Sequence, residues 1–310
     1  MIQGAVANIL DYGAVADYNE NTPGSGTDNS AAIQAAVDAV DAQGVYNKGA
    51  VYIPAGSYKI LSAIDVPYGV SIFGAGGTAS VLHAENCDGL NFTSYGYQIG
   101  SMFYEDFGLT AATGTNRAAI TALTNASTMD GLYFHRLRFY GWNQCLVLSS
   151  NWNCTISECV GQNINQGVTL AEGDGEALGI RIINNRFTKA SGGLGSADEY
   201  AINLVSTTKF IESVHILTNQ IFGFTRNVNI GKCYFANIVG NDFSGSENVI
   251  YFDTPTGGYT VQNNFIEVVG ASGCGIYIPS VGLQDNTFRT EIRNNNIQNT
   301  AGSSPYGIDI

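Results

Sequence analysis

Acidic side chains gather in one short segment of this 310-residue chain, where Glu172, Asp174 and Glu176 alternate with glycines. A further acid, Asp253, directly follows the apolar triplet Ile250-Tyr251-Phe252. Glycoside hydrolysis uses two carboxyl groups, about 5–5.5 Å apart for retention of configuration and about 6.5–9.5 Å apart for inversion. We take these four acids as candidate catalytic residues for glycan cleavage, with Glu172 first. A solvated acidic turn is the alternative interpretation of the same segment.

Polar side chains also recur at the centre of short apolar triplets such as Ile202-Asn203-Leu204. Side chains alternate across a strand, so the central residue points away from the core when its neighbours are buried. A tyrosine there offers a flat apolar face to a pyranose ring and a hydroxyl to the edge of the ring. We take Asn203, Asn229, Tyr251 and Tyr277 as candidates for sugar binding, and an ordinary solvated sheet face is the alternative. The full row reads Thr169, Asn203, Asn229, Tyr251, Tyr277 and Asp309.

Three basic side chains indicate a different reaction. Elimination on a uronate needs a base at the C5 proton and a cation beside the carboxylate. Arg181, His215 and Lys232 are the candidates for these tasks and for substrate binding. The first two belong to a second predicted row, which reads Tyr133, Thr155, Arg181, His215, Asn237, Thr260 and Glu291. A lyase or epimerase of uronate polymers is therefore the second candidate function, and a non-catalytic glycan-binding rod is the third.

We expect neither a metal nor another cofactor. The cysteines show no Cys-x-x-Cys pattern, and no Cys/His spacing fits a zinc site. They stand beside apolar strand residues, which predicts buried free thiols. The six are Cys87, Cys145, Cys154, Cys159, Cys233 and Cys274.

The elements that must position these residues repeat from about Ile180 onward. An asparagine stands two residues before an apolar residue at intervals of 34, 22, 23 and 31 residues, and the apolar triplets recur at intervals of 34, 26, 22, 26 and 32. Two short strands per irregular repeat predict a stacked solenoid, here an all-β parallel β-helix. Stacked asparagines at turns would also form a hydrogen-bonded ladder. These asparagines are Asn185, Asn219, Asn241, Asn264 and Asn295.

The N-terminal segment predicts a different element. Residues 8–14 have the pattern of a strand ending in a glycine turn, and a helix capped by Asp28 or Ser30 should run to about Val40. This helix would cover the open end of the first coil. We expect residues 1–50 to form this strand and capping helix and residues 51–310 to form the coils of one elongated domain. The final strand, at Ile310, would need further chain or a partner to cover its edge.

Composition narrows the function classes. A formal net charge of −13 disfavours nucleic-acid binding, because a polyphosphate would be repelled. No run of 18 or more apolar residues is present, so we expect no membrane insertion. The N-terminus has no basic region followed by an apolar one, and we expect no export signal.

Three N-terminal motifs resemble those of the pectate-lyase-like superfamily. They are Asn8-Ile9-Leu10-Asp11-Tyr12-Gly13-Ala14, the stretch Thr27-Asp28-Asn29-Ser30-Ala31-Ala32-Ile33, and Gly49-Ala50-Val51-Tyr52-Ile53-Pro54-Ala55-Gly56. In that superfamily such motifs open right-handed β-helices of phage tailspike depolymerases, family 28-related glycoside hydrolases and alginate epimerases. The chain lacks the Asn-Thr-Asp with downstream Gly-His-Gly of polygalacturonase-type hydrolases and the Tyr-Gly-Phe-Asp-Pro-His of alginate epimerases. The resemblance therefore favours the tailspike group.

This resemblance implies a specific function. A tailspike-like chain would bind a bacterial surface polysaccharide, either capsule or O-antigen, and depolymerise it. We favour hydrolysis with a carboxylate pair over elimination as the reaction. It would be made in the host cytoplasm, assemble as a homotrimer and act outside the cell on a virion tail.

Overall fold

The structure of the chain is a computed structural model. The described residues are 5–44, 48–93, 98–111, 117–123, 129–149, 151–171, 176–189, 199–205, 210–254, 257–269, 273–279, 289–300 and 306–309.

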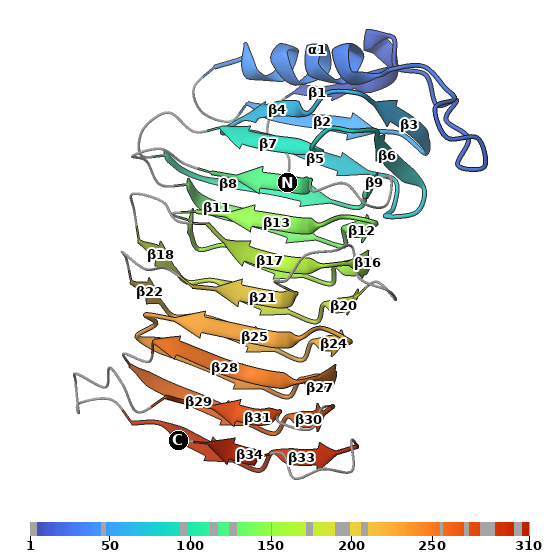
Figure 1. The fold of residues 1–310 in the computed structure, drawn as a ribbon. Coiled ribbons are helices and arrows are strands. Elements are labelled where there is room, and N and C mark those ends of the chain that lie inside the picture. Colours follow the sequence, from blue (N-terminus) through green and yellow to red (C-terminus); the bar gives the residue numbers. More distant parts are fainter. Residues whose placement is uncertain are drawn as a thin grey trace.

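The described residues form a parallel β-helix of the right-handed type, in which the chain visits three sheets in turn and stacks each new strand on the previous coil. Figure 1 shows the coils descending from the N-terminal helix to the C-terminal strands. Within the described ranges all pairings between the strands are parallel, and sheets A, B and C contain 14, 10 and 10 strands. The predicted all-β parallel β-helix is therefore confirmed.

The strand bounds define the three sheets. Sheet A contains β1 (Ala5–Asn8), β2 (Gly49–Ile53), β5 (Val70–Gly74), β8 (Gln98–Glu105), β11 (Met129–His135), β14 (Asn151–Trp152), β15 (Thr155–Ser157), β18 (Ala177–Leu178), β19 (Arg181–Ile183), β22 (Ile211–Glu212), β23 (Val214–Leu217), β26 (Phe235–Val239), β29 (Gly258–Gln262) and β32 (Glu291–Arg293). Sheet B contains β3 (Gly56–Ile60), β6 (Ser80–Ala84), β9 (Gly108–Ala111), β12 (Arg138–Tyr140), β16 (Val160–Ile164), β20 (Arg186–Lys189), β24 (Gln220–Phe222), β27 (Asp242–Ser246), β30 (Phe265–Val268) and β33 (Asn296–Asn299). Sheet C contains β4 (Ile64–Pro67), β7 (Leu90–Thr93), β10 (Ala118–Ala122), β13 (Gln144–Leu148), β17 (Gln166–Leu170), β21 (Tyr200–Leu204), β25 (Arg226–Gly231), β28 (Asn248–Thr254), β31 (Cys274–Tyr277) and β34 (Tyr306–Asp309).

The predicted helix is α1 (Ser30–Asp41), and it lies across the N-terminal end of the stack (Figure 1). It packs on β1, β2 and β4 through a fully buried apolar stripe that includes Ile33, Val37 and Val40. Its N-cap is Asn29, whose side chain makes no capping hydrogen bond, while the Asp28 carboxylate accepts the Ser30 N–H at 3.0 Å. The helix thus covers the first coil as expected, with the start signal supplied by Asp28 one residue before the cap.

The predicted strand over residues 8–14 is wrong. The strand β1 ends at Asn8, and Ile9–Tyr12 forms a short 3-10 helix that closes at Gly13 with a φ of 92°. The reason is local, because the Asn8 carboxamide oxygen accepts the Leu10 N–H at 3.0 Å and draws the backbone out of the extended form. The signal in this motif is a turn rather than a strand.

The core consists of equivalent apolar residues stacked from coil to coil. Ile182, Ile216, Ile238 and Val261 are consecutive partners in sheet A, and all four are fully buried. Each such side chain contributes about 1.5–3 kcal/mol of hydrophobic stabilisation. All six cysteines are free and buried, which confirms the prediction from their sequence context.

The predicted asparagine ladder forms the corner between sheets A and B. Asn185, Asn219 and Asn241 each donate from Nδ2 to the Oδ1 of the next ladder asparagine at 3.0, 3.0 and 2.9 Å, and Asn264 does the same to Asn295 at 2.9 Å. The residue before each ladder asparagine has left-handed backbone, namely Asn184, Thr218, Gly240, Asn263 and Asn294. The ladder residues themselves supply hydrogen bonds rather than an unusual φ.

Candidate functional site

The predicted polar row lies on sheet C, with one residue per coil. Thr169, Asn203, Asn229, Tyr251 and Tyr277 are consecutive Cα partners, and Asp309 follows Tyr277. Neighbouring strands of a sheet lie about 4.8 Å apart, so the row follows the long axis of the β-helix at that spacing. An extended polymer is the kind of ligand that such a row can contact at several points.

The C-terminal half of this row is aromatic and cationic. The rings of Tyr251 and Tyr277 stack with their centroids 4.7 Å apart and an interplanar angle of 18°. The Arg226 guanidinium lies 4.0 Å from the centroid of Tyr251 and 5.6 Å from that of Tyr200. Burial raises the pKa of Tyr251, with a smaller opposing effect of Arg226. The phenol therefore remains a hydrogen-bond donor at neutral pH.

The two asparagines of the row form a pair. The Asn229 Nδ2 donates to the Asn203 Oδ1 at 2.9 Å. The Asn229 side chain is 6% exposed, so it is less open to solvent than an outward row predicts. Its Oδ1 is buried and has no hydrogen-bond partner among the described residues. Such an atom costs about 1–3 kcal/mol, and a ligand hydroxyl could remove that cost.

The structure describes only two of the four candidate acids, because Glu172 and Asp174 lie outside the described residues. Glu176 is exposed and precedes β18, and its main-chain oxygen accepts the Trp152 indole N–H at 3.1 Å. Asp253 is exposed and lies inside β28, not after its strand as expected, since the register shifts where Ile230 gives way to Gly231.

The register also separates these two acids. Ala177 pairs with Ile211, and Ile211 pairs with Cys233. Glu176 and Lys232 each come one residue before these partners, so they occupy equivalent positions two coils apart. The strand that contains Asp253 is one step further. Three steps amount to about 14 Å, which is wider than the about 9.5 Å limit for an inverting pair. Glu176 and Asp253 are therefore too far apart to form a carboxylate pair with each other.

The second predicted row lies on sheet A. Its residues are consecutive Cα partners from Tyr133 to Glu291, with Arg181 opposite His215. Burial and, to a smaller extent, the Arg181 charge lower the pKa of His215, and Asn237 Nδ2 lies 3.3 Å from its Nδ1. A neutral imidazole beside a guanidinium is a suitable base. The substrate-binding candidates are thus divided between two faces, with Lys232 at the turn after β25.

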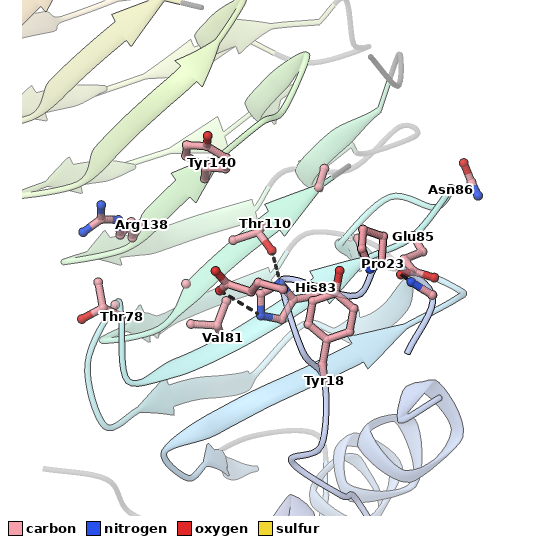
Figure 2. Close-up of a pocket in the computed structure, with 16 residues that line it drawn as sticks. Tyr18, Pro23, Thr78, Val81, His83, Glu85, Asn86, Thr110, Arg138 and Tyr140 are labelled. Atoms are coloured by element: carbon pink, nitrogen blue, oxygen red, sulfur yellow. Dashed lines mark hydrogen bonds and ion pairs between the residues drawn. The ribbon is translucent and has the colours of Figure 1, made fainter. Parts of the chain in front are cut away.

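One pocket was missed by the sequence analysis. It has a volume of about 830 Å³ and lies over sheet B, between β6, β9 and β12 and the loop around Tyr18 to Gly24. Figure 2 shows Tyr18 and His83 side by side within it, with Arg138 and Tyr140 on the opposite side. The register brings residues 83, 110 and 140 together, and no spacing in the sequence announces that contact.

Two features are absent from the described residues. No group of three or more His, Cys, Asp and Glu side chains is placed to hold a metal ion in these ranges. None of the helical structure in the described part of the chain has the length and apolar character needed to cross a membrane.

Comparison with known proteins supports the resemblance seen in the sequence. Residues 6–106 match the family model described as rhamnogalacturonase A/epimerase, pectate lyase-like. No protein with a curated description matches the sequence significantly. The resemblance to the pectate-lyase-like group is therefore confirmed over the N-terminal third of the chain.

Solved structures with a similar fold include phage tailspikes and an epimerase. A mutant tailspike protein of E. coli bacteriophage HK620 in complex with a pentasaccharide is similar with a TM-score of 0.62 and 13% identity, over 97% of this chain and 59% of that chain. A second mutant of the same tailspike, also with pentasaccharide, gives 0.59 and 13% over 97% and 64%. The A-module of a mannuronan C-5 epimerase of Azotobacter vinelandii gives 0.49 and 17% over 99% of both chains. The chain thus spans about three fifths of the length of the tailspikes.

Proposed function

We propose that this chain binds a bacterial surface polysaccharide, capsule or O-antigen, and depolymerises it by glycoside hydrolysis with a carboxylate pair. The observation that carries the proposal is the sheet C row, in which Asn203 and Asn229 continue into the stacked rings of Tyr251 and Tyr277. The pentasaccharide complexes of the structurally similar tailspikes support a glycan as the ligand.

Each part of the row has a task in this proposal. The Tyr251 and Tyr277 rings form an apolar platform for sugar faces, and their hydroxyls reach ring edges. The unpartnered Asn229 Oδ1 accepts a sugar hydroxyl. Arg226, held over Tyr251, offers its remaining N–H groups to glycan oxygens. Together these groups orient an extended chain along the axis of the β-helix.

The chemistry is assigned to the acids beside this row. One carboxylic acid protonates the glycosidic oxygen, and a second carboxylate activates water or attacks the anomeric carbon. We assign these tasks to two of the acids Glu172, Asp174, Glu176 and Asp253, but not to Glu176 together with Asp253, because those two are about 14 Å apart. Lys232 directly follows β25, the strand that pairs with the strand of Asp253, and we assign its ammonium group to substrate binding.

The test separates an enzyme from a binding rod. The protein is incubated with a panel of capsular and O-antigen polysaccharides, and new reducing ends are measured with Glu172→Gln and Asp253→Asn as matched, nearly isosteric variants. We expect loss of at least a hundredfold in rate for the variant that removes an acid of the pair. Full activity of both variants would overturn the catalytic assignment. Binding without any shortening on every glycan would leave only the non-catalytic rod.

A second candidate function rests on the pair of Arg181 and His215 on sheet A. Its basis is the lowered pKa of His215, which gives a neutral base next to a cation. A uronate held there could lose its C5 proton to the imidazole while the guanidinium neutralises its carboxylate. The ultraviolet absorbance of the unsaturated product distinguishes elimination from hydrolysis. His215→Gln should abolish that absorbance and leave hydrolysis intact.

The proposal includes a cellular setting. We propose that the protein is made in the host cytoplasm, assembles as a homotrimer and acts outside the cell on a virion tail. The similarity to phage tailspikes supports the virion tail.

A further inference from the structure

The pocket over sheet B is built on a row of its own. Lys59, His83, Thr110 and Tyr140 are consecutive Cα partners on β3, β6, β9 and β12. The loop around Tyr18 to Gly24 passes over the N-terminal end of this row and forms one wall of the pocket (Figure 2). The pocket therefore lies on a different face from the Asn203–Tyr277 row of sheet C.

The loop that forms the wall is fixed to the sheet. The Tyr18 N–H donates to the Ser57 carbonyl at 3.2 Å. Gly24 is held from two sides, because its N–H donates to the Glu85 Oε1 at 2.8 Å and its carbonyl accepts from the Lys59 Nζ at 3.1 Å. Because this loop is already ordered, ligand binding does not incur the conformational-entropy cost of ordering it.

The floor of the pocket contains a buried polar atom without a partner. His83 is 5% exposed, its ring stacks on Tyr18 at a centroid distance of 4.2 Å, and its Nδ1 is 2.5 Å from the Thr110 Oγ1. Its Nε2 has no hydrogen-bond partner among the described residues, and the Glu20 Oε1 lies 3.7 Å away. Burial lowers the pKa of His83 to about 4, so the imidazole is neutral at physiological pH. His83 and Glu20 both line the pocket, so a ligand hydroxyl between them would give the neutral nitrogen a hydrogen-bond partner.

The charges around the pocket indicate which chemical class of ligand it can bind. Glu20 and Glu85 are the acids of its lining, and Arg138 is its base. An anion would face two carboxylates, and a cation would face the guanidinium. Hydroxyl groups both donate and accept, so a neutral polyhydroxylated molecule satisfies all of these groups. Tyr140 adds an apolar ring face on the opposite side, as in sites for pyranose rings (Figure 2).

We propose that this pocket is a second carbohydrate site, separate from the sheet C row, that binds a neutral sugar ring through His83 Nε2 and the Glu20 carboxylate. The inference goes beyond the proposed function, since it assigns no cleavage to the pocket and uses none of the residues of the row. A chain with two glycan contacts on different faces would engage a dense polysaccharide layer with greater avidity than one contact allows.

The test uses the fact that the chain has only three histidines. The protein is labelled with ¹³C at histidine Cε1, and D-glucose, D-galactose and N-acetyl-D-glucosamine are added separately, with D-glucuronate as the charged counterpart. At least one neutral sugar should shift the resonance that His83→Phe removes and leave those of His135 and His215 in place. Glucuronate should bind at least tenfold more weakly, because it faces Glu20 and Glu85.

Two variants complete the test. Glu20 has a largely exposed side chain, so Glu20→Gln keeps the fold and should weaken binding of the neutral sugar about tenfold. Tyr277→Ala, on sheet C, should leave that binding unchanged. The proposal is overturned if no neutral sugar shifts the His83 resonance, if glucuronate binds equally well, or if Glu20→Gln has no effect. Polysaccharide cleavage is measured in parallel, so failure here is distinguishable from failure of the proposed function.

Discussion

Tyr251 and Tyr277 are the residues on which the glycan-binding proposal depends most directly. Replacing Tyr277 by alanine removes one ring of the stack and should weaken glycan binding by about 1–2 kcal/mol, which is roughly five- to thirtyfold in Kd. Calorimetry with the polysaccharide that the protein recognises, in the Glu172→Gln variant to prevent cleavage, measures this change. Tyr277→Phe is the matched control and should retain most of the affinity. Equal glycan affinity of the Tyr277→Ala and wild-type chains would show that the Tyr277 ring is not part of the glycan-binding site.

His83 gives the chain a defined response to acid. Its pKa is about 4 in the folded chain and 6.5 ordinarily, so between these values the unfolded chain binds a proton that the folded chain does not. The free energy of unfolding is therefore unaffected by His83 above about pH 6.5 and falls as the pH decreases, by about 2 kcal/mol at about pH 5 and about 3 kcal/mol below about pH 4.

Two measurements check this response. The Cε1 resonance of His83 should titrate with a midpoint near 4 in the folded protein. Denaturation curves at neutral pH and at about pH 5 should differ less for His83→Phe than for the wild type, because phenylalanine cannot take up the proton. A midpoint near the ordinary value would show that water reaches the ring.

At the level of the strand and turn, the asparagine ladder is the element with the clearest energetic consequence. Asn241 accepts from the N–H and the Nδ2 of Asn219 and donates to Asn264 and to the Ile216 carbonyl. Asn241→Ala leaves several buried groups unpaired and should lower the free energy of unfolding by about 3 kcal/mol or more. Chemical denaturation measures the loss. Gln220→Ala, at an exposed position on β24, should change stability by less than about 0.5 kcal/mol.

The elements that repeat were predictable from the sequence. The apolar triplets and the Asn-x-apolar pattern recur once per coil. Both the sheet C row and the sheet A row therefore have the predicted register. Ile9–Tyr12 was predicted as part of a strand but forms a 3-10 helix, because one local hydrogen bond of the Asn8 side chain determines its backbone conformation. The bulge at Asp253 was missed for a similar reason, since a register shift leaves no mark on the alternation of apolar residues.

The pocket over sheet B shows what the repeat does not predict. His83, Thr110 and Tyr140 are 27 and 30 residues apart, in coils where the spacing is irregular. The wall of the pocket comes from a polar loop more than fifty residues before His83 in the sequence, tied down by Lys59 and Glu85. Contacts of this kind depend on the packing of loop against sheet, which single-sequence patterns do not encode.

At the scale of the whole molecule, sheet A presents apolar rings to solvent. Phe103 is 44% exposed and stacks on Tyr133 at 5.1 Å, and Phe235 is 47% exposed. The strands of Phe103 and Phe235 lie five steps apart in sheet A, so the two rings would contribute separate apolar contacts to an interface on this face. The glycan row of sheet C and the pocket over sheet B would remain accessible if this face were covered by further copies of the chain, whereas Arg181 and His215 of the second candidate function lie on the covered face.

The proposed function includes a homotrimer, and we expect its contact to lie on sheet A. Light scattering after size-exclusion chromatography should give about three times the 32.9 kDa of one chain. Phe103→Lys combined with Phe235→Lys should shift the protein to monomers, because lysine ammonium groups cannot be buried unpaired in an apolar contact. Leu123→Lys, at a residue of similar exposure just after β10 of sheet C, is the control and should leave the trimer intact. A wild-type monomer, or a trimer that withstands the double substitution, would show that sheet A serves another purpose.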